Sequence, residues 1–292
     1  MSILDTLKNS TWLRWPLLAF SRLLLRPLKA GPSLLRRAAY DALPVRYFVT
    51  GQREQFVVST RDKVIGRELF LQGEFDFGKL QSALDILSRE GLPLPRHLID
   101  VGANVGSITI PALARGLVHD ASAIEPHPEN LRLLQANLAL NGLAERVRVL
   151  GLAVGADTSS QLNLRESASN SGNHSIGAVG IAVPSARLDD LDLPHPDALL
   201  WMDIEGYEGH ALHGAANLLA SGLPVVCEFN PGFLCESGGL SWFQAALAGR
   251  RIFDLQDNTR TETTLDALAS ALDTHLAYTD ILAIPAGQGR RV

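Results

Sequence analysis

The sequence of 292 residues contains only two cysteines, Cys227 and Cys235. Two thiols cannot build a disulfide framework, and they supply too few sulfur ligands for a zinc site of the cysteine type. No spacing of His, Asp and Glu resembles a dedicated metal loop, so no metal is expected. The scarcity of cysteine favours a reducing compartment, and we therefore predict a cytoplasmic protein.

The chain also lacks an excess of positive charge, since its formal net charge is −5 and its pI is about 5.9. The charge is uneven along the sequence. Residues 1–46 carry eight Lys or Arg and two acids, a net charge of +6, which leaves −11 for the remainder. A nucleic-acid binder needs a basic surface to neutralise phosphates, so a nucleic-acid partner is not expected.

A long uncharged run is absent as well. Within residues 11–30 the longest charge-free run is Trp15 to Ser21, whereas a membrane span needs about 20 nearly uncharged residues. Arginines interrupt this stretch, which argues against a secretory signal too. On a helical wheel the basic residues gather on one side and the apolar residues on the other; they are Arg14, Arg22, Arg26 and Lys29 against Leu13, Leu17, Phe20, Leu23, Leu24 and Leu28.

We therefore predict that residues 1–50 form a basic amphipathic helical extension. Its apolar face could pack on its own domain, on a second subunit, or on an anionic membrane surface. The sequence is therefore compatible both with a homodimer and with a peripheral membrane contact through residues 1–46.

What is present, from about residue 95 onward, is an alternation of short apolar segments with helical ones. The apolar segments that predict buried strands are 97–101, 121–125, 146–150, 198–203 and 224–229. Between the second and third, Pro128 suits a first helical position and Asn141 with Gly142 ends the helix. This pattern predicts an α/β domain over residues 51–292, with a mostly parallel sheet and helices on both faces.

Acidic residues stand at or near the ends of four of these strands: Asp100, Glu125, Asp203 and Glu228. In an open parallel sheet, ligands bind beyond the carboxyl ends of the strands, where the strand order reverses. We therefore expect the four side chains to border one site.

The turn after the first strand, from Asp100 to Ser107, identifies the ligand that the site suits. It has one of the three glycines of a dinucleotide fingerprint and lacks the Lys-Ser/Thr pair of a P-loop. Asp100 would repel a phosphate but suits an ammonium or sulfonium centre, and Glu125 is placed to accept hydrogen bonds from ribose hydroxyls. Each residue alone has a structural alternative, a tight turn for the glycines and a helix cap for Asp100.

Together these features predict S-adenosyl-L-methionine (SAM) as the cofactor. The expected cofactor-binding residues are Asp100, Gly102, Asn104, Gly106, Ser107, Glu125, Pro126, Ala153 and Asp203.

An ordered series of segments resembles the FkbM family of SAM-dependent methyltransferases. The segments are LIDVGANVG (98–106), AIEPHPENLRLLQANLALNG (123–142), SARLDDL (185–191), DIEGYEGHALHGA (203–215) and TDILAIP (279–285). The resemblance implies a class I SAM-methyltransferase (Rossmann-like) fold, with a seven-stranded sheet whose last strand runs antiparallel. It also implies O-methylation of a hydroxyl on a sugar, polyketide or related small metabolite. The sequence departs from the family at Trp201, where a lysine is usual, and this departure concerns the acceptor rather than the cofactor.

An alcohol is a weak nucleophile near neutral pH, so we expect a general base at the site. The candidate bases are Glu205, then Asp203, then Glu228, with His174 as an alternative because its reference pKa is near 6.5. A divalent ion held by Asp203, Glu205 and His174 is less favoured. The polar loop 167–175 follows a strand-like segment at the expected active edge, where loops often carry specificity. The expected substrate-binding residues are Asn173, His174, Ser175 and Tyr207.

The expected partner is a small hydroxyl acceptor, a glycan or a secondary metabolite. The main alternative is a catalytically inactive protein that uses the methyltransferase fold for binding or as a scaffold, because a fold alone does not set a function. Retention of the acids in register favours an enzyme. An N-methyltransferase is a further alternative, less favoured because an amine acceptor would not need so many carboxylate bases.

Overall fold

The computed structural model describes residues 31–42, 45–51, 53–157, 161–167, 169–194, 197–257, 260–272 and 274–287. The amphipathic segment expected around residues 13–29 lies outside these ranges, so its contact with a membrane or a second subunit stays a prediction. Over the described ranges, no helix combines the length and the apolar character that crossing a membrane requires.

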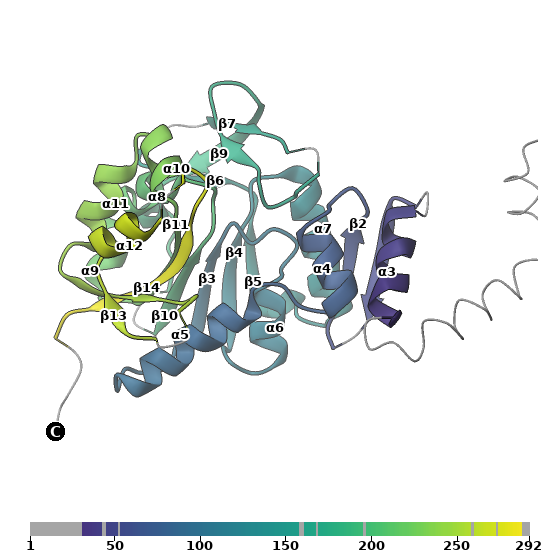
Figure 1. The fold of residues 1–292 in the computed structure, drawn as a ribbon, viewed down its shortest axis with the longest axis horizontal. Coiled ribbons are helices and arrows are strands. Elements are labelled where there is room, and N and C mark those ends of the chain that lie inside the picture. The colour runs from purple at the N-terminus through teal and green to yellow at the C-terminus, as the bar shows by residue number, and fades with distance from the viewer. Residues whose placement is uncertain are drawn as a thin grey trace, which may run out of the picture.

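A central sheet of eight strands, in the order β13-β12-β14-β11-β10-β3-β4-β5, organises the molecule (Figure 1). The five strands from β11 to β5 are parallel, whereas β14 runs antiparallel to both β11 and β12. The bounds are β3 His97–Val101, β4 Asp120–Ile124, β5 Val147–Leu150, β10 Ala198–Met202, β11 Val225–Phe229, β12 Arg250–Asp254, β13 Glu262–Thr263 and β14 Thr279–Pro285. The prediction of a mostly parallel α/β sheet is confirmed, and the short strand β13 makes eight strands rather than seven.

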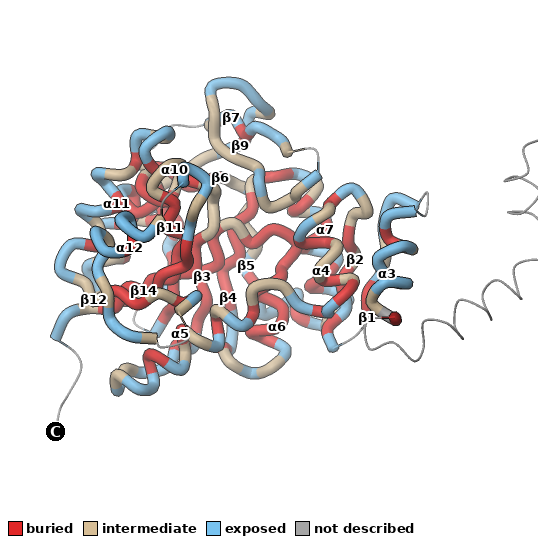
Figure 2. Tube along the Cα trace, in the orientation of Figure 1, coloured by how far each residue is buried: buried red, intermediate tan, exposed pale blue. Residues whose placement is uncertain are grey.

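Successive residues of the central strands pack on opposite faces of the sheet, as the period of a strand requires. Leu98 belongs to one apolar cluster and Ile99 to the other. The first cluster is covered by α4 Ile65–Gln72, α5 Phe77–Arg89, α6 Thr109–Ala114 and α7 Pro128–Leu140. The second is covered by α8 Glu208–His213, α9 Ala216–Ala220, α10 Pro231–Glu236, α11 Leu240–Leu247 and α12 Leu265–Ala271. Figure 2 shows the buried strands at the centre, between helices whose outer sides are exposed.

The strand order reverses between β3 and β10. From β3 the chain continues outward through β4 and β5, whereas from β10 it continues to β11 on the other side. The register pairs Asp100 with Trp201, and the backbone N–H of Asp203 donates to the carbonyl of Val101. The carboxyl ends of β3 and β10 therefore lie side by side, which is where an open α/β sheet binds ligands.

A smaller unit precedes the central sheet in the chain, formed by α3 Gly31–Ala42, the hairpin of β1 Tyr47–Gly51 with β2 Gln55–Ser59, and α4. The hairpin is fixed to α7 through Asn137, whose side-chain oxygen accepts from the N–H of Val57 at 2.6 Å and whose amide donates to the carbonyl of Val57 at 3.3 Å. The expected boundary near residue 50 thus falls inside a hairpin. At the end of the expected 1–50 helical extension, residues Tyr47–Gly51 form the strand β1 instead of a helix.

A second sheet, of four strands in the order β6-β9-β7-β8, lies beside the carboxyl ends of the central strands (Figure 1). Its strands are β6 Ala153–Val154, β7 Gln161–Arg165, β8 Ser175–Ile176 and β9 Ile181–Ala186. The strand β7 pairs antiparallel with β9 and precedes the polar loop, where the sequence predicts a strand-like segment. The loop between β7 and β8, residues 166–174, is called the cover loop below.

Candidate cofactor and active site

The turn between β3 and α6 brings two strand ends very close together. Gly102 has a φ of 85°, and a Cβ at this position would lie 2.0 Å from the carbonyl oxygen of Asp203. Only glycine allows this approach and this backbone conformation without strain. Asn104 also has a positive φ, 50°, which Asn tolerates better than most residues do.

Gly106 has a packing function in this turn. Its φ is 91°, and a Cβ there would lie 2.7 Å from Cδ1 of Ile110 on α6. It was expected among the cofactor-binding residues, but it does not line the pocket described below. A glycine is needed here because the turn and α6 pack closely.

Glu125, directly after β4, is held by two backbone amides. Its Oε2 accepts from the N–H of Asn104 at 2.8 Å, and its Oε1 accepts from the N–H of His127 at 2.7 Å. Burial raises the pKa of Glu125 to about 7, although these hydrogen bonds oppose the rise. The carboxyl group is therefore fixed in orientation and partly ionised at neutral pH.

Asp100, at the end of β3, is buried and accepts a hydrogen bond from the hydroxyl of Thr109 on α6. Burial raises the pKa of Asp100 to about 6. This contact ties β3 to the first residue of α6, although the N-cap of that helix is Ile108 and not Asp100. Asp100 nevertheless lines the pocket, so the structural and the ligand-binding interpretations are compatible.

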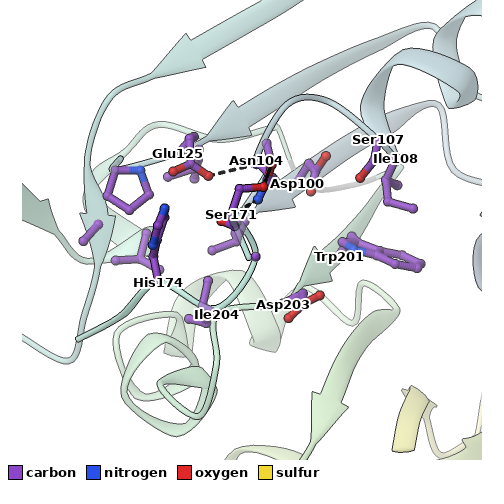
Figure 3. Close-up of a pocket in the computed structure, with 18 of the residues that line it drawn as sticks. Asp100, Asn104, Ser107, Ile108, Glu125, Ser171, His174, Trp201, Asp203 and Ile204 are labelled. Carbon is purple, nitrogen blue, oxygen red and sulfur yellow. Dashed lines mark hydrogen bonds between the residues drawn. The ribbon is translucent and has the colours of Figure 1, made fainter. Parts of the chain in front are cut away.

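One pocket brings the expected cofactor residues together. Every expected cofactor-binding residue except Gly106 lines it. Figure 3 shows Glu125 and His174 at one end of the pocket and Ser107, Ile108 and Trp201 at the other. Several residues that were not predicted to belong to the site also line the pocket: Ile65, Phe75, Asp76, Ile108, Leu152, Leu164, Ser171, Gly172, Ile176, Trp201 and Ile204.

The candidate bases differ in their position relative to this pocket. Asp203 and His174 line it, whereas Glu205 and Glu228 do not. Burial, reinforced by the charge of Asp280, raises the pKa of Asp203 to about 7. Burial and the neighbouring Asp203 raise the pKa of Glu205 to about 8 and that of Glu228 to about 10. Of the four acids expected to border one site, Asp100, Glu125 and Asp203 line this pocket and Glu228 does not.

A lysine that the sequence analysis missed accompanies these acids. The Nζ of Lys79 on α5 lies 2.7 Å from Oδ2 of Asp280 and 3.0 Å from Oδ2 of Asp76. Its positive charge also lowers the pKa of Asp203. Lys79 lies far from Asp203 in sequence and in no motif, so the sequence alone gave no signal for this contact.

Glu208 lies at the first turn of α8 and is buried. A carboxylate at a helix start is usually solvated, but the side chain of Glu208 is 1% exposed. Its Oε1 accepts from the N–H of Ile204 at 2.9 Å, and burial raises its pKa to about 8. Glu208 therefore stabilises the turn that positions Asp203.

The cover loop closes over the pocket through Ser171. The carbonyl of Ser171 accepts from the side-chain amides of Asn104 at 2.8 Å and Asn130 at 3.1 Å. Its hydroxyl donates to Oδ2 of Asp62 at 2.6 Å. Asn104 thus links the glycine turn to the cover loop, a contact between segments that no local sequence pattern reveals.

The expected substrate-binding residues divide into two groups. His174 and Tyr207 line the pocket. Asn173 is exposed and its side-chain oxygen accepts from the amide of Asn170, while Ser175 accepts from Arg165 at 3.0 Å. Neither Asn173 nor Ser175 lines this pocket, and their contact with an acceptor stays a prediction.

The less favoured metal alternative finds no support in the geometry. Across the described ranges, no three His, Cys, Asp or Glu side chains are arranged to hold a metal ion, and this includes Asp203, Glu205 and His174.

The sheet order, the antiparallel β14, the glycine turn after β3 and the acid after β4 define a class I methyltransferase fold, a variant of the Rossmann-like architecture. The family model described as the methyltransferase FkbM domain matches residues 100–255. This match covers just over half of the chain, so the chain belongs to the FkbM methyltransferase family. The family that the motifs resemble is thereby confirmed.

Other similarities are partial. A cobalt-precorrin-6B C(15)-methyltransferase (decarboxylating) of Salmonella typhimurium is 43% identical over 72 residues, which are 24% of this chain and 37% of that protein. The chain therefore spans well under half the length of this curated relative. An O-methyltransferase from Bacillus cereus, solved with SAH, is 16% identical, with a TM-score of 0.40 over 71% of this chain and 80% of that one. TYW2 of M. jannaschii, solved with AdoMet, is 12% identical, with a TM-score of 0.42 over 82% and 85%.

Proposed function

We propose that the protein is a SAM-dependent methyltransferase that transfers a methyl group to a hydroxyl of a small metabolite such as a sugar or a polyketide. The observation that carries the proposal is one pocket with a fixed carboxyl group, Glu125, at one end and two aspartates beside the glycine turn, the buried Asp100 and the half-buried Asp203. These charges match a ligand that combines a ribose with positive centres.

The Glu125 end suits a nucleoside. Each carboxylate oxygen already accepts one backbone N–H, from Asn104 and His127, and each has a further lone pair. The two hydroxyls of a ribose can use these lone pairs. Apolar side chains of the pocket, Leu152 and Ile176 among them, provide a wall for the base.

The aspartate end suits the amino-acid part of SAM, which carries an ammonium group and adjoins the sulfonium. Burial makes ionised Asp100 and Asp203 unfavourable without a counter-charge, and a nearby cation favours the ionised form. A pyrophosphate would instead add negative charge here. The residues present therefore fit SAM and do not fit a dinucleotide.

SAM, when bound, supplies an activated methyl group. The task that remains for the protein is to align an acceptor oxygen with that methyl and to remove a proton from the acceptor. Asp203 is the carboxyl among the candidate bases that lines the pocket, and its pKa of about 7 leaves it partly ionised. Glu228, with a pKa raised to about 10, holds its proton at neutral pH and is not available as a base there.

Calorimetric titration tests the proposal directly. We expect SAM and S-adenosylhomocysteine (SAH) to bind at micromolar concentration, with NAD and ATP as non-binding controls. Formation of SAH from SAM is then followed with a panel of hydroxyl-bearing sugars and polyketides. Absence of SAM and SAH binding would refute the proposal, and binding without turnover on any acceptor would favour the scaffold alternative.

The free thiols of Cys227 and Cys235 support a reducing, cytoplasmic location.

A further inference from the structure

The imidazole of His174, in the cover loop, has its hydrogen-bonding pattern fixed by its own loop. The backbone N–H of Ser167 donates to Nδ1 of His174 at 2.9 Å. Since a backbone N–H can only donate, Nδ1 must be the acceptor nitrogen. In a neutral imidazole the other nitrogen then carries the hydrogen, so His174 is the Nε2–H tautomer.

A second imidazole beside it is fixed in the same way. Nδ1 of His127 accepts from the N–H of Asn130 at the start of α7, which leaves its Nε2 to donate to Glu166 at 3.0 Å. The rings of His127 and His174 pack with their centroids 4.1 Å apart. The His174 ring is therefore held on one face by His127 and along one edge by the backbone of its loop.

His174 is also neutral at physiological pH. Burial lowers the pKa of His174 to about 4, with the adjacent His127 acting in the same direction, although Glu166, Asp62 and Glu129 act in the opposite direction. A protonated ring would place a hydrogen on Nδ1 and break the contact with Ser167. Geometry and charge thus agree on one protonation state.

The Nε2–H is the remaining polar group of the His174 ring, and within the described part of the chain it has no hydrogen-bond partner. His174 lines the pocket at the same end as Glu125 (Figure 3). Apolar Leu164 and Ile176 line the pocket too. A neutral donor among apolar walls, next to a carboxyl group suited to ribose, matches an uncharged ligand atom that accepts a hydrogen bond.

We propose that His174 is a cofactor-binding residue whose Nε2–H donates to an acceptor atom of the bound nucleoside, a ring nitrogen of adenine or an oxygen of the ribose. The inference rests on the proposed function, since it requires a nucleoside in this pocket. It also reassigns His174, which the sequence analysis considered as a base. A general base needs a free lone pair facing the acceptor, and the Nε2–H tautomer has none there.

The first test is calorimetric titration of SAH, which needs no acceptor. His174→Phe keeps a flat ring on His127 but removes the donor, and His174→Gln restores an N–H donor on a side chain of similar reach. We expect about a 10-fold loss of SAH affinity in the first variant and at most about a 3-fold loss in the second. His119→Phe, the same substitution at an exposed histidine before β4, is the matched control with unchanged affinity.

Equal SAH affinity in wild type and His174→Phe would overturn the inference while leaving the proposed function intact. Failure of the wild type to bind SAH would instead refute the proposed function.

The second test examines the tautomer in the wild-type protein and so does not depend on the folding of a variant. Two-bond ¹H–¹⁵N spectra distinguish a protonated ring nitrogen from an acceptor one, and loss of the signal in His174→Gln assigns it. We expect Nε2 protonated and Nδ1 unprotonated at pH 7, with a shift of the Nε2 resonance on adding SAH. A charged ring, the Nδ1–H tautomer, or a ring unaffected by bound SAH would each contradict the inference.

Discussion

Glu228 should lower the stability of the protein increasingly as pH rises, and Glu228→Gln should remove this effect. The side chain is 8% exposed, and burial together with Asp203 raises its pKa from the ordinary 4.5 to about 10. Between these two values the folded protein keeps a proton that the unfolded chain has released. The folded state then binds more protons, so the free energy of unfolding falls as pH rises.

The size of the effect follows from linkage. One full proton changes the free energy of unfolding by about 1.4 kcal/mol per pH unit. From pH 5 to pH 7 this gives an upper limit of about 3 kcal/mol. Neighbouring Asp203 and Glu205 share the titration, so we expect about 1–3 kcal/mol for Glu228 alone.

Thermal unfolding at pH 5 and pH 7 provides the assay. The neutral amide in Glu228→Gln should stabilise the protein at pH 7 by about 3–8 °C in Tm, and by much less at pH 5. Glu145→Gln, a change at an exposed carboxylate, is the control with no such difference. An equal Tm change at both pH values, or a lower Tm at pH 7, would refute the burial of an uncompensated carboxyl group.

Three further outcomes are expected. Glu125→Ala should weaken SAH binding by about 1–3 kcal/mol in calorimetry, because ribose hydroxyls lose a buried acceptor; unchanged affinity would exclude the ribose contact. Lys79→Met should raise the pKa of Asp203, so that SAM affinity increases at a higher pH than in the wild type. Adding Asp280→Asn should reverse this shift, whereas a loss of affinity that is equal at every pH would indicate a structural effect only. Gly102→Ala should cost about 2–4 kcal/mol in urea unfolding because of its positive φ and the contact with Asp203; a wild-type midpoint would contradict the close approach.

The sequence allowed prediction of the elements whose signals are local. The strands β3, β4, β5, β10 and β11 match the predicted apolar segments to within about one residue, because buried parallel strands are short continuous apolar runs. Between β10 and β11 the chain forms two short helices, α8 and α9, rather than one continuous helix. The break falls at Gly214, where a Cβ would lie 2.1 Å from the carbonyl oxygen of Gly155, a contact between distant segments.

The site shows the same division between local and distant signals. Asp100, Glu125 and Asp203 were predictable because each follows a strand of the same sheet, and the topology brings their ends together. Lys79 and Ser171 were not, because they reach the site from α5 and from the cover loop. At Gly106 the structure shows a packing contact, because a glycine in a motif can serve packing as readily as ligand contact.

The free-energy cost of burying acidic side chains at the carboxyl edge of the sheet argues for a cationic ligand and against a scaffold. Lys79 pairs with Asp280 and Asp76, yet Asp203 and Glu228 keep strongly raised pKa values. A scaffold would gain stability from replacing such groups, because buried carboxyl groups without a partner are destabilising. Positions at which a stable protein departs from the usual rules for burying charge tend to belong to functional sites. A ligand with a sulfonium and an ammonium group supplies the missing positive charge, so the arrangement that weakens the free protein is the one that would bind SAM.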